Sequence, residues 1–446
     1  MEYIDSFFAE FVSYAWGWQT ALLLLGAGVY FSVKTKLKPF RYLGFAFEVL
    51  QGKHPSKDEV GEVSHFRALT ASLSGTIGLG NIAGVAVAIQ LGGPGAIFWM
   101  WVTAVFGIAT KFFTATLSVL YRETGPDGKP NAGTMYIIKN GLPKYMMPLA
   151  YFFAFSGVIA GLPAFQANQV VQLTNDLYFP EVENFSYYAG AFLAVITAAV
   201  VLGGLRRIAN VSALLVPLMG GLYLVAVLIA VLLNYQQFFP ALALIVTEAF
   251  SFDSAVVGGL VGVILTGIKR GAFSNEAGIG TEALIHGAAK TSSPVKQGLI
   301  AMTGPIFDTL IMCTLTAVII LISGVYQVSD SQGVSLTSEA FLATLGPVGP
   351  IILFVCVVSF GLSTIFTYSY YGSSCAKFLF GDKSVKIYQY IFIIFVFIFS
   401  ITSLDLALNV IDSAFAMMAI PTLIASIWLA PKVIEQSDKY FSSLKR

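Results

Sequence analysis

Runs of about twenty apolar residues recur from one end of this chain to the other, and each is long enough, as a helix, to cross a bilayer. Only 11% of the 446 residues are charged, whereas a soluble domain carries about 25%. The chain therefore lacks the polar surface that a soluble protein with so many buried helices would need. These patterns predict an all-α, polytopic protein that lies in a lipid bilayer.

We predict eleven transmembrane helices within a single domain that covers residues 1–446. The predicted spans are residues 16–34, 66–90, 93–120, 146–174, 188–205, 210–233, 254–288, 297–325, 347–376, 385–402 and 405–430. If 16–34 is an extra helix, the other ten divide into a first repeat of five, 66–233, and a second repeat of five, 254–430. The two repeats begin on opposite sides of the membrane and so have inverted topology.

The basic residues are confined to alternate connecting segments. Among the 25 Lys and Arg residues, Lys111, Lys269 and Arg270 lie in the interior of predicted spans, and the others fall in segments on one side of the membrane or at the span ends next to them. The segments on the other side carry acidic residues. Because Lys and Arg mark cytoplasmic segments, we expect a multi-pass protein of the cell's inner (plasma) membrane. Its N-terminus would face outside and its C-terminus the cytoplasm.

Two of the predicted spans contain glycine-rich polar stretches. Span 66–90 holds GTIGLGN at 75–81, and span 254–288 holds RGAFSNEAGIG at 270–280. A glycine in a helix interior costs about 1 kcal/mol relative to alanine, so the closely spaced glycines favour a local opening of each helix. Close helix packing through small residues is an alternative, for instance with Gly80 and Gly84. Packing does not account for the polar residues that accompany these glycines.

An opened helix inside a membrane must be buried or line a cavity, because its free backbone groups are costly in lipid. Amide N–H groups at such a break suit a carboxylate, and carbonyl groups suit Na⁺. The two interrupted spans are the first spans of the two inverted repeats, which is the sequence pattern of a transporter binding site. The sequence therefore predicts a secondary transporter.

Other functional classes find little support in the sequence. An ion channel would need a continuous polar pore, and an enzyme would need clustered catalytic residues, of which the sequence shows no pattern. The cysteines Cys313, Cys356 and Cys375 have neither disulfide nor metal-ligand spacing. We expect no catalytic residues, no cofactor beyond a coupling ion, no nucleic acid and no obligate protein partner.

The same residues resemble a known family, the alanine or glycine:cation symporters, also called the sodium:alanine symporter family. The matching stretches are SGTIGLGNIAGVAVAI at 74–89, GGPGAIFWMWV at 92–102, GIATKF at 107–112, RGAFSNEAGIG at 270–280, HGAAKTSSPVKQGLIAM at 286–302, SYYG at 369–372 and MAIPTLIA at 418–425. The resemblance implies a leucine-transporter-like fold of two inverted five-helix repeats. It also implies Na⁺ as coupling ion and a small neutral amino acid as cargo.

The resemblance also assigns residues to two sites. It implies a substrate site formed by Gly78, Gly80, Asn81, Gln166, Phe273, Ser274, Asn275 and Tyr368. It implies a Na⁺ site formed by the hydroxyl groups of Ser363 and Thr364 with backbone carbonyls around Gly75 and Ile77. The implied activity is Na⁺-coupled symport of alanine or glycine by alternating access. The alternative is a proton-coupled transporter of a larger or more polar neutral amino acid, such as serine or glutamine.

The chain departs from the family pattern at four positions. Leu79 stands where the family usually has Thr, and Tyr368 where it usually has Trp. Thr114 lies where an acid is usual, and Glu282 where a small or apolar residue is usual. Because Tyr368 is smaller than Trp and adds a hydroxyl group, the chain is expected to tolerate serine or glutamine beside alanine and glycine.

Further ionisable residues fall within spans. Asp308 is a candidate for either the ion pathway or a structural pair, and Asp412 has no assigned role. Lys269 and Arg270 lie close to Glu276 in sequence, so they are expected either to form an ion-pair cluster with it beside the second break or to act as gate residues.

Overall fold

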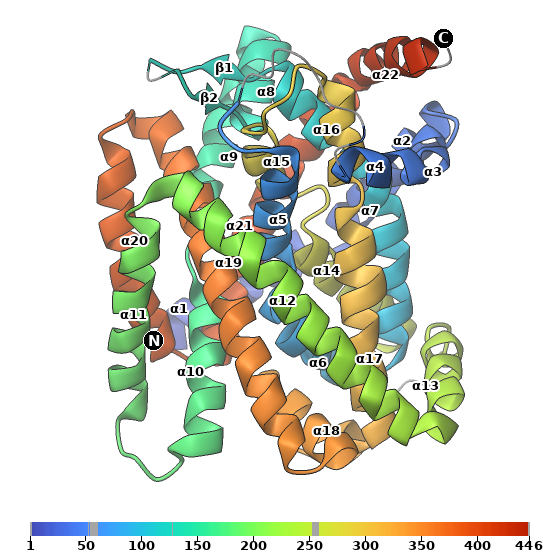
Figure 1. The fold of residues 1–446 in the computed structure, drawn as a ribbon, viewed down its shortest axis with the longest axis vertical. Helices are drawn as coiled ribbons and strands as arrows, with labels where there is room; N and C mark the ends of the chain where they lie inside the picture. Colours follow the sequence, from blue (N-terminus) through green and yellow to red (C-terminus); the bar gives the residue numbers. More distant parts are fainter. Residues whose placement is uncertain (1, 52, 54–60, 127, 252–257, 445–446) are drawn as a thin grey trace.

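The computed structural model describes residues 2–51, 53, 61–126, 128–251 and 258–444. Long helices run roughly side by side along the long axis of the molecule (Figure 1). The only strands among the described residues are β1 (Glu123–Thr124) and β2 (Pro130–Asn131), which pair antiparallel. The predicted all-α class is therefore confirmed. The first four residues of the predicted span 254–288 lie outside the described residues.

Seven helical stretches within the described residues are long and apolar enough to cross a membrane. They are α5 with α6 (His65–Gly92), α7 (Gly95–Leu120), η1 with α9 and α10 (Lys144–Tyr178), α12 (Gly204–Leu233), α16 with η2 and α17 (Pro294–Ser323), α19 (Val348–Phe380) and α21 (Leu404–Trp428). Shorter apolar helices are α11 (Phe185–Val201), α18 (Val334–Leu345) and α20 (Ser384–Ser400). The predicted extra helix corresponds to α2 (Trp18–Lys34). The total of eleven spans stays a prediction.

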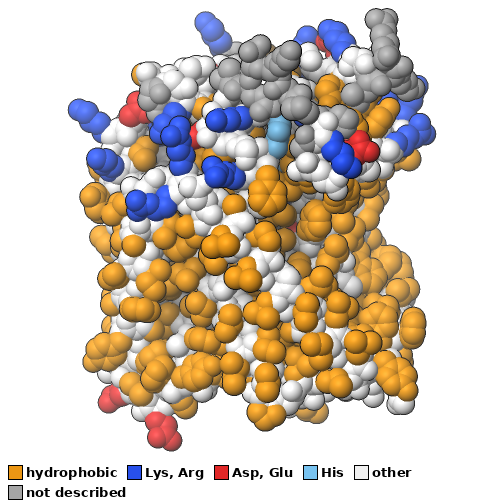
Figure 2. Space-filling view, in the orientation of Figure 1, with side chains coloured by type: hydrophobic (Ala, Val, Ile, Leu, Met, Phe, Trp, Pro, Cys, Tyr) orange, Lys and Arg blue, Asp and Glu red, His pale blue; other side chains and the backbone are white. Residues whose placement is uncertain are grey.

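The surface separates into a basic end and an apolar belt (Figure 2). Lys and Arg side chains gather at the end that carries the β hairpin, α8 (Thr134–Gly141), α16 (Pro294–Ala301) and α22 (Ala430–Leu444). We call this the basic end. Hydrophobic side chains cover most of the visible face between this end and a few acidic side chains at the opposite end, and residues of α12 such as Leu214 and Leu232 are 70% and 72% exposed. Such a belt is stable only against lipid.

Both predicted helix breaks are present. In the first, α5 (His65–Thr76) ends before Ile77 and Gly78, and α6 (Leu79–Gly92) begins after them. In the second, residues 276–280 separate the end of α14 (Gly259–Asn275) from the start of α15 (Thr281–His286). Within the second break Gly278 and Gly280 have φ of +86° and +93°, a conformation that glycine adopts without strain. The halves α5 and α15 point toward the basic end (Figure 1).

Two further interruptions were not predicted. The predicted span 146–174 divides into α9 (Met147–Ala160) and α10 (Ala164–Tyr178), with Pro163 between them. Proline cannot continue the hydrogen bonding of a helix and so favours this division. In the predicted span 297–325, residues Ile306–Cys313 form a π-helical stretch, η2, between α16 and α17 (Thr314–Ser323). Such stretches often occur at functional sites.

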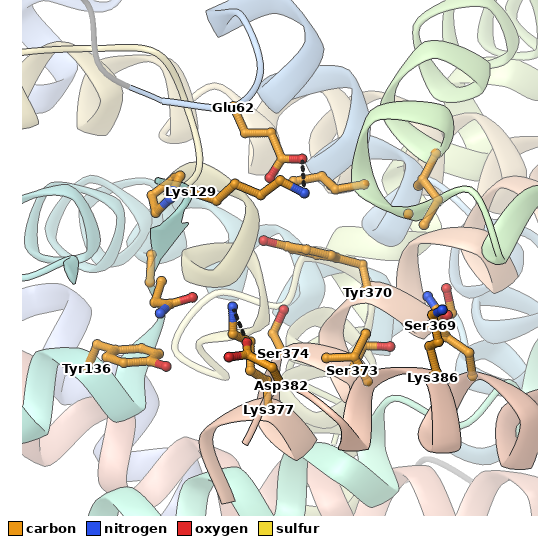
Figure 3. Close-up of a pocket in the computed structure, with 18 residues that line it drawn as sticks. Glu62, Lys129, Tyr136, Ser369, Tyr370, Ser373, Ser374, Lys377, Asp382 and Lys386 are labelled. Carbon is orange, nitrogen blue, oxygen red and sulfur yellow. Dashed lines mark ion pairs between the residues drawn. The ribbon is translucent and has the colours of Figure 1, made fainter. Parts of the chain in front are cut away.

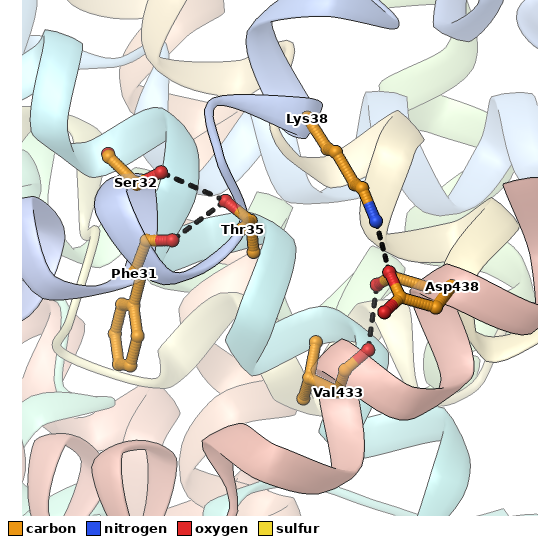
Figure 4. A network of polar contacts seen from close by, with 7 residues as sticks. Phe31, Ser32, Thr35, Lys38, Val433 and Asp438 are labelled. Carbon is orange, nitrogen blue, oxygen red and sulfur yellow. Dashed lines mark hydrogen bonds and ion pairs between the residues drawn. The ribbon is translucent and has the colours of Figure 1, made fainter.

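Several short helices complete the fold. They are α1 (Glu2–Ala15), α3 (Lys38–Arg41), α4 (Leu43–Leu50), η1 (Lys144–Met146), α13 (Tyr235–Glu248) and η3 (Val325–Gln327). The segment after α2 is held at the basic end by an ion pair between Lys38 and Asp438 of α22 (Figure 4). Just before α2, the Trp16 indole N–H donates to the Asp412 carbonyl oxygen of α21 at 2.8 Å. The N-terminal segment is thus attached to the C-terminal helices near both ends.

Candidate functional site

The first break is shaped by contacts at its glycines. The Gly78 N–H donates to Asn81 Oδ1 at 2.8 Å, and the first amides of α6, those of Leu79 and Gly80, have no partner within their helix because of their position. A side chain at position 78 would collide with the Thr364 hydroxyl, and one at position 80 would lie 3.3 Å from the Phe273 ring. The glycines therefore allow α19 and α14 to approach the open backbone.

The second break is centred on Glu276, which is fully buried. Its carboxylate accepts hydrogen bonds from the hydroxyl groups of Thr281 at 2.6 Å, Tyr368 at 3.0 Å and Tyr371 at 3.3 Å. The predicted pairing of Lys269 and Arg270 with Glu276 is wrong. Both basic side chains instead form ion pairs with Asp412 of α21, because they lie on α14 before the break while Glu276 turns toward α19.

Asp308 connects the two breaks. Its carboxylate accepts from Asn81 Nδ2 and Ser274 Oγ, both at 2.7 Å, and from Thr309 Oγ1 at 2.6 Å. Asn275, by contrast, uses its side chain locally: its Oδ1 accepts from the Ala277 N–H and its Nδ2 donates to Thr309 Oγ1. Of the two predicted site residues Ser274 and Asn275, only Ser274 therefore contacts the first break directly, through Asn81.

Gln166 lies on α10 among buried aromatic side chains. Its side chain is 2% exposed and interacts with the Tyr368 hydroxyl, while its Oε1 atom has no hydrogen-bond partner in the described part of the chain. The Phe273 ring packs edge-on against Phe165, with centroids 5.5 Å apart, and lies 5.7 Å from Phe415. Gln166 thus lies next to the tyrosine that donates to Glu276 in the second break, and the Phe273 ring lies against Gly80 of the first break. Burying a polar atom without a partner is costly, which makes Oε1 a candidate ligand group.

The predicted Na⁺ ligands lie where α19 passes the first break. Thr364 Oγ1 donates to the Ser74 carbonyl at 2.9 Å, and Ser74 Oγ donates to the Ser363 carbonyl at 2.8 Å. The Ser363 hydroxyl donates within its own helix, to the Phe360 carbonyl at 3.0 Å. Gly75 and Ile77 adjoin this contact in sequence, but its hydrogen bonds run through Ser74. Sequence reasoning missed Ser74, although it lies inside the recognised glycine-rich stretch 74–89.

A cavity of about 310 Å³ opens at the basic end (Figure 3). Ser369, Tyr370 and Ser373 of α19 line one wall, and ion pairs of Lys129 with Glu62 and of Lys377 with Asp382 lie around it. Burial, and next the Glu123 carboxylate, raise the pKa of Tyr136 on another wall to about 12, so this phenol stays protonated at neutral pH. Ser369 directly follows Tyr368. One helix therefore joins this cavity to the region of the breaks.

Sequence reasoning missed a polar cluster beside the inner halves of the broken helices. Thr114 Oγ1 of α7 donates to Glu282 Oε1 of α15 at 2.6 Å, and buried Lys111 acts electrostatically on both Glu282 and Glu276. Nearer the basic end, Gln297 contacts His65 Nδ1 at 2.7 Å and His286 Nδ1 at 2.6 Å. The charged residues Lys111, Glu276 and Glu282 within apolar spans could have indicated such a cluster. Which of them lie close together depends on the fold and could not be read from the sequence.

A profile of the sodium:alanine symporter family matches residues 1–446. The chain belongs to this family. The family assignment agrees with the resemblance of the glycine-rich and SNEAG stretches, and it makes the chain a multi-pass membrane protein of a transport family.

Named relatives of this family member extend over nearly its whole length. The sodium/alanine symporter AgcS of Methanococcus maripaludis is 39% identical over 443 residues, which cover 97% of this chain and 96% of the relative. The probable sodium/glutamine symporter GlnT of Bacillus subtilis is 33% identical over 433 residues, with 97% and 89% covered. The amino-acid carrier protein AlsT of Bacillus subtilis is 34% identical over 406 residues, with 90% and 85% covered.

A solved structure resembles the fold of this family member. MhsT, in its complex with L-phenylalanine, superposes with a TM-score of 0.53 over 85% of this chain and 98% of MhsT. The sequence identity is 14%, so the likeness concerns the fold alone. It agrees with the expected leucine-transporter-like fold.

Proposed function

We propose that the protein couples the movement of Na⁺ to the uptake of a small neutral amino acid, with alanine or glycine as the first candidates. The observation that carries this proposal is the buried, unpartnered Gln166 Oε1 on a side chain that interacts with Tyr368, the tyrosine that donates to Glu276 in the second break. A zwitterion needs a donor group for its carboxylate and an acceptor for its ammonium group. The helix N-terminus at Leu79 and Gly80 supplies the first, and Gln166 supplies the second.

The aromatic enclosure sets the expected size of the cargo. Phe165, Phe273 and Phe415 are at most 3% exposed, and Tyr368 is 2% exposed. Because the Tyr368 hydroxyl already donates to Glu276, its orientation is fixed, and we propose that it forms the wall that the amino-acid side chain meets. One methylene in such a pocket changes binding by about 1–3 kcal/mol, so serine is expected to compete with alanine more weakly but measurably.

The proposed cation site uses Ser363 and Thr364 with first-break carbonyls near Gly75 and Ile77. Its support is the direct contact of Thr364 with Ser74 at the end of α5, where an interrupted helix presents carbonyl groups suited to Na⁺. The names of AgcS and GlnT as sodium symporters support Na⁺ as the coupling ion.

Alternating access would act through the two inverted repeats, 66–233 and 254–430. The basic end would face the cytoplasm, as the distribution of Lys and Arg suggests (Figure 2). In this arrangement the inner halves α5 and α15 separate from each other and from α19 to release cargo toward the cavity lined by Ser369 and Ser373. Transport of this kind needs no catalytic residues.

The test compares two glutamine variants in proteoliposomes. Gln166→Leu should lower uptake of labelled alanine at least tenfold under a Na⁺ gradient, because the ammonium group loses its acceptor. Gln90→Leu is the matched control, since Gln90 is a half-buried glutamine near the end of α6 that donates to the Ser331 carbonyl at 2.5 Å. Its uptake should stay within about twofold of the unchanged protein. Equal uptake by both variants would place the amino-acid site elsewhere.

A further inference from the structure

The cavity at the basic end is lined by charged and polar groups from segments that lie far apart in the sequence. Glu62 precedes α5, Lys129 directly precedes β2, Ser373 belongs to α19 and Lys386 to α20. The cavity volume of about 310 Å³ corresponds to roughly ten water molecules at about 30 Å³ each. It is therefore large enough for a small polar solute together with several waters.

On one wall of this cavity, a cation and a hydroxyl group both lack a partner. Lys386 forms no ion pair with any residue that the structure describes. It also stands in the first turn of α20, where the helix dipole disfavours a positive charge. The Ser373 side chain is 5% exposed, and its Oγ atom has no hydrogen-bond partner in the described part of the chain. A negatively charged group bound at this wall would satisfy both.

Glu62 presents the opposite charge to the same cavity. Its side chain is 8% exposed, and its ion pairs with Lys129 at 3.7 Å and Arg206 at 4.0 Å both reach Oε1. Both contacts are longer than a hydrogen bond, and among the described residues none donates to Oε2. Figure 3 shows Glu62 on one side of the Tyr370 ring and Ser373 on the other. An ammonium group, which has three donors, would supply what Oε2 lacks.

We propose that this cavity binds a zwitterionic amino acid, at a site separate from the one at the two breaks. The carboxylate of the ligand lies at Lys386 and Ser373, and its ammonium group lies at Glu62, with waters bridging where a contact is long. A lipid phosphate or a free anion would satisfy Lys386 but would leave Glu62 Oε2 without a donor. A zwitterion satisfies both and adds no net charge to the cavity.

A ligand at this position would hold together elements that have to separate during release. Glu62 lies just before α5, whereas Ser373 and Lys386 belong to α19 and α20. This step rests on the proposed function, in which α5 separates from α19 to release cargo. A ligand that binds the closed arrangement more tightly shifts the population toward it. Amino acid that accumulates at the basic end would therefore slow further release.

The test follows a single thiol placed in the cavity of the purified full-length protein in detergent. The reporter is Ser374→Cys, because Ser374 lines the cavity while the three native cysteines are buried. Alanine should slow its reaction with a small neutral maleimide at least threefold. Propionate and ethylamine, which each carry only one of the two charges, should not. Adding Lys386→Ala should raise the alanine concentration for half protection at least tenfold, and adding Ser373→Ala at least threefold.

Two further variants make the result specific to this cavity. Lys383→Ala is the matched control, because Lys383 is an exposed lysine at the start of α20 that does not line the cavity, and it should leave protection unchanged. Gln166→Leu, which removes the acceptor proposed for transport, should also leave protection unchanged. A failure of the proposed function therefore shows in uptake and not in this measurement.

Three outcomes would overturn the proposal. The first is unchanged half protection in both Lys386→Ala and Ser373→Ala, and the second is loss of protection in Gln166→Leu. The third is protection by propionate equal to that by alanine, or by phosphatidylglycerol vesicles in the absence of any effect of alanine, which would assign the cavity to an anion or a lipid.

Discussion

At the scale of single residues, two departures from the family pattern face each other. In the family pattern that the resemblance implies, an acid is expected near position 114 and a small or apolar residue near position 282, and this chain has Thr and Glu there. The two side chains form a hydrogen bond of 2.6 Å, and both are 0% exposed. Relative to that implied pattern, the carboxylate stands on α15 instead of α7, and Lys111 acts on it electrostatically. Sequence comparison could find each departure but could not show that one compensates for the other.

We therefore predict that a carboxylate at position 114 of α7 can replace the one at position 282 of α15. Glu282→Ala removes negative charge near buried Lys111 and should destabilise the protein by about 1–3 kcal/mol. Adding Thr114→Glu should recover most of the loss, because the new carboxylate enters the same contact from the other helix. Thermal unfolding of the purified variants measures both effects.

A neighbouring threonine provides the control for this exchange. Thr116 is equally buried on α7, but its hydroxyl donates to the Phe112 carbonyl of its own helix. Thr116→Glu combined with Glu282→Ala should be less stable than Glu282→Ala alone. Recovery by both double variants, or by neither, would refute the idea that the carboxylate changed helix.

At the scale of elements, the glycine pattern predicted both broken helices within a few residues. The breaks could be predicted because their cause is local: closely spaced glycines destabilise a helix whatever its tertiary surroundings. The division of 146–174 was missed, although Gly161 and Pro163 carried the signal. The π-helical stretch η2 has no comparable signal. It places Asp308 and Cys313 beside Ser274 and Asn81, and such a fit arises only when the helices are packed.

The second break supplies a prediction about backbone conformation. Gly280 has φ of +93°, and a methyl group there would lie 2.5 Å from the hydroxyl groups of Thr134 and Thr422. Gly280→Ala should therefore lower the unfolding temperature and reduce alanine uptake. Gly220→Ala in α12 is the control, because its methyl group meets nothing within 4 Å and a helix interior favours alanine by about 1 kcal/mol. Equal stability of the two variants would mean that the break relaxes easily.

At the scale of the whole molecule, the pattern of basic residues predicted one charged end, and Figure 2 shows Lys and Arg gathered there. The sequence did not predict which distant helices would meet. Lys269 and Arg270 pair with Asp412 more than a hundred residues away rather than with nearby Glu276. Within a membrane, buried charges must find partners wherever the fold brings them, so proximity in sequence was a poor guide.

The proposed orientation can be tested by labelling single cysteines in intact cells. The three native cysteines are all buried, so their background reaction should be low. A membrane-impermeant thiol reagent should label Glu181→Cys, which lies between α10 and α11, and should label Lys432→Cys of α22 only after the cells are opened. Both positions are exposed. Labelling of Lys432→Cys in intact cells would reverse the orientation.

The pairing of backbone segments at the basic end has a consequence for how long a cell keeps what it has taken up. The Glu62 and Val63 N–H groups both donate to the Ala288 carbonyl, and the Lys290 N–H donates to the Val63 carbonyl, so the segment before α5 is bonded to the one after α15. At about 1 kcal/mol for each bond, opening this end costs roughly 3 kcal/mol, or a factor of about 100 in population. An empty carrier would then expose its inner side only rarely. A starving cell whose sodium gradient has collapsed would lose its amino-acid pool slowly through this protein.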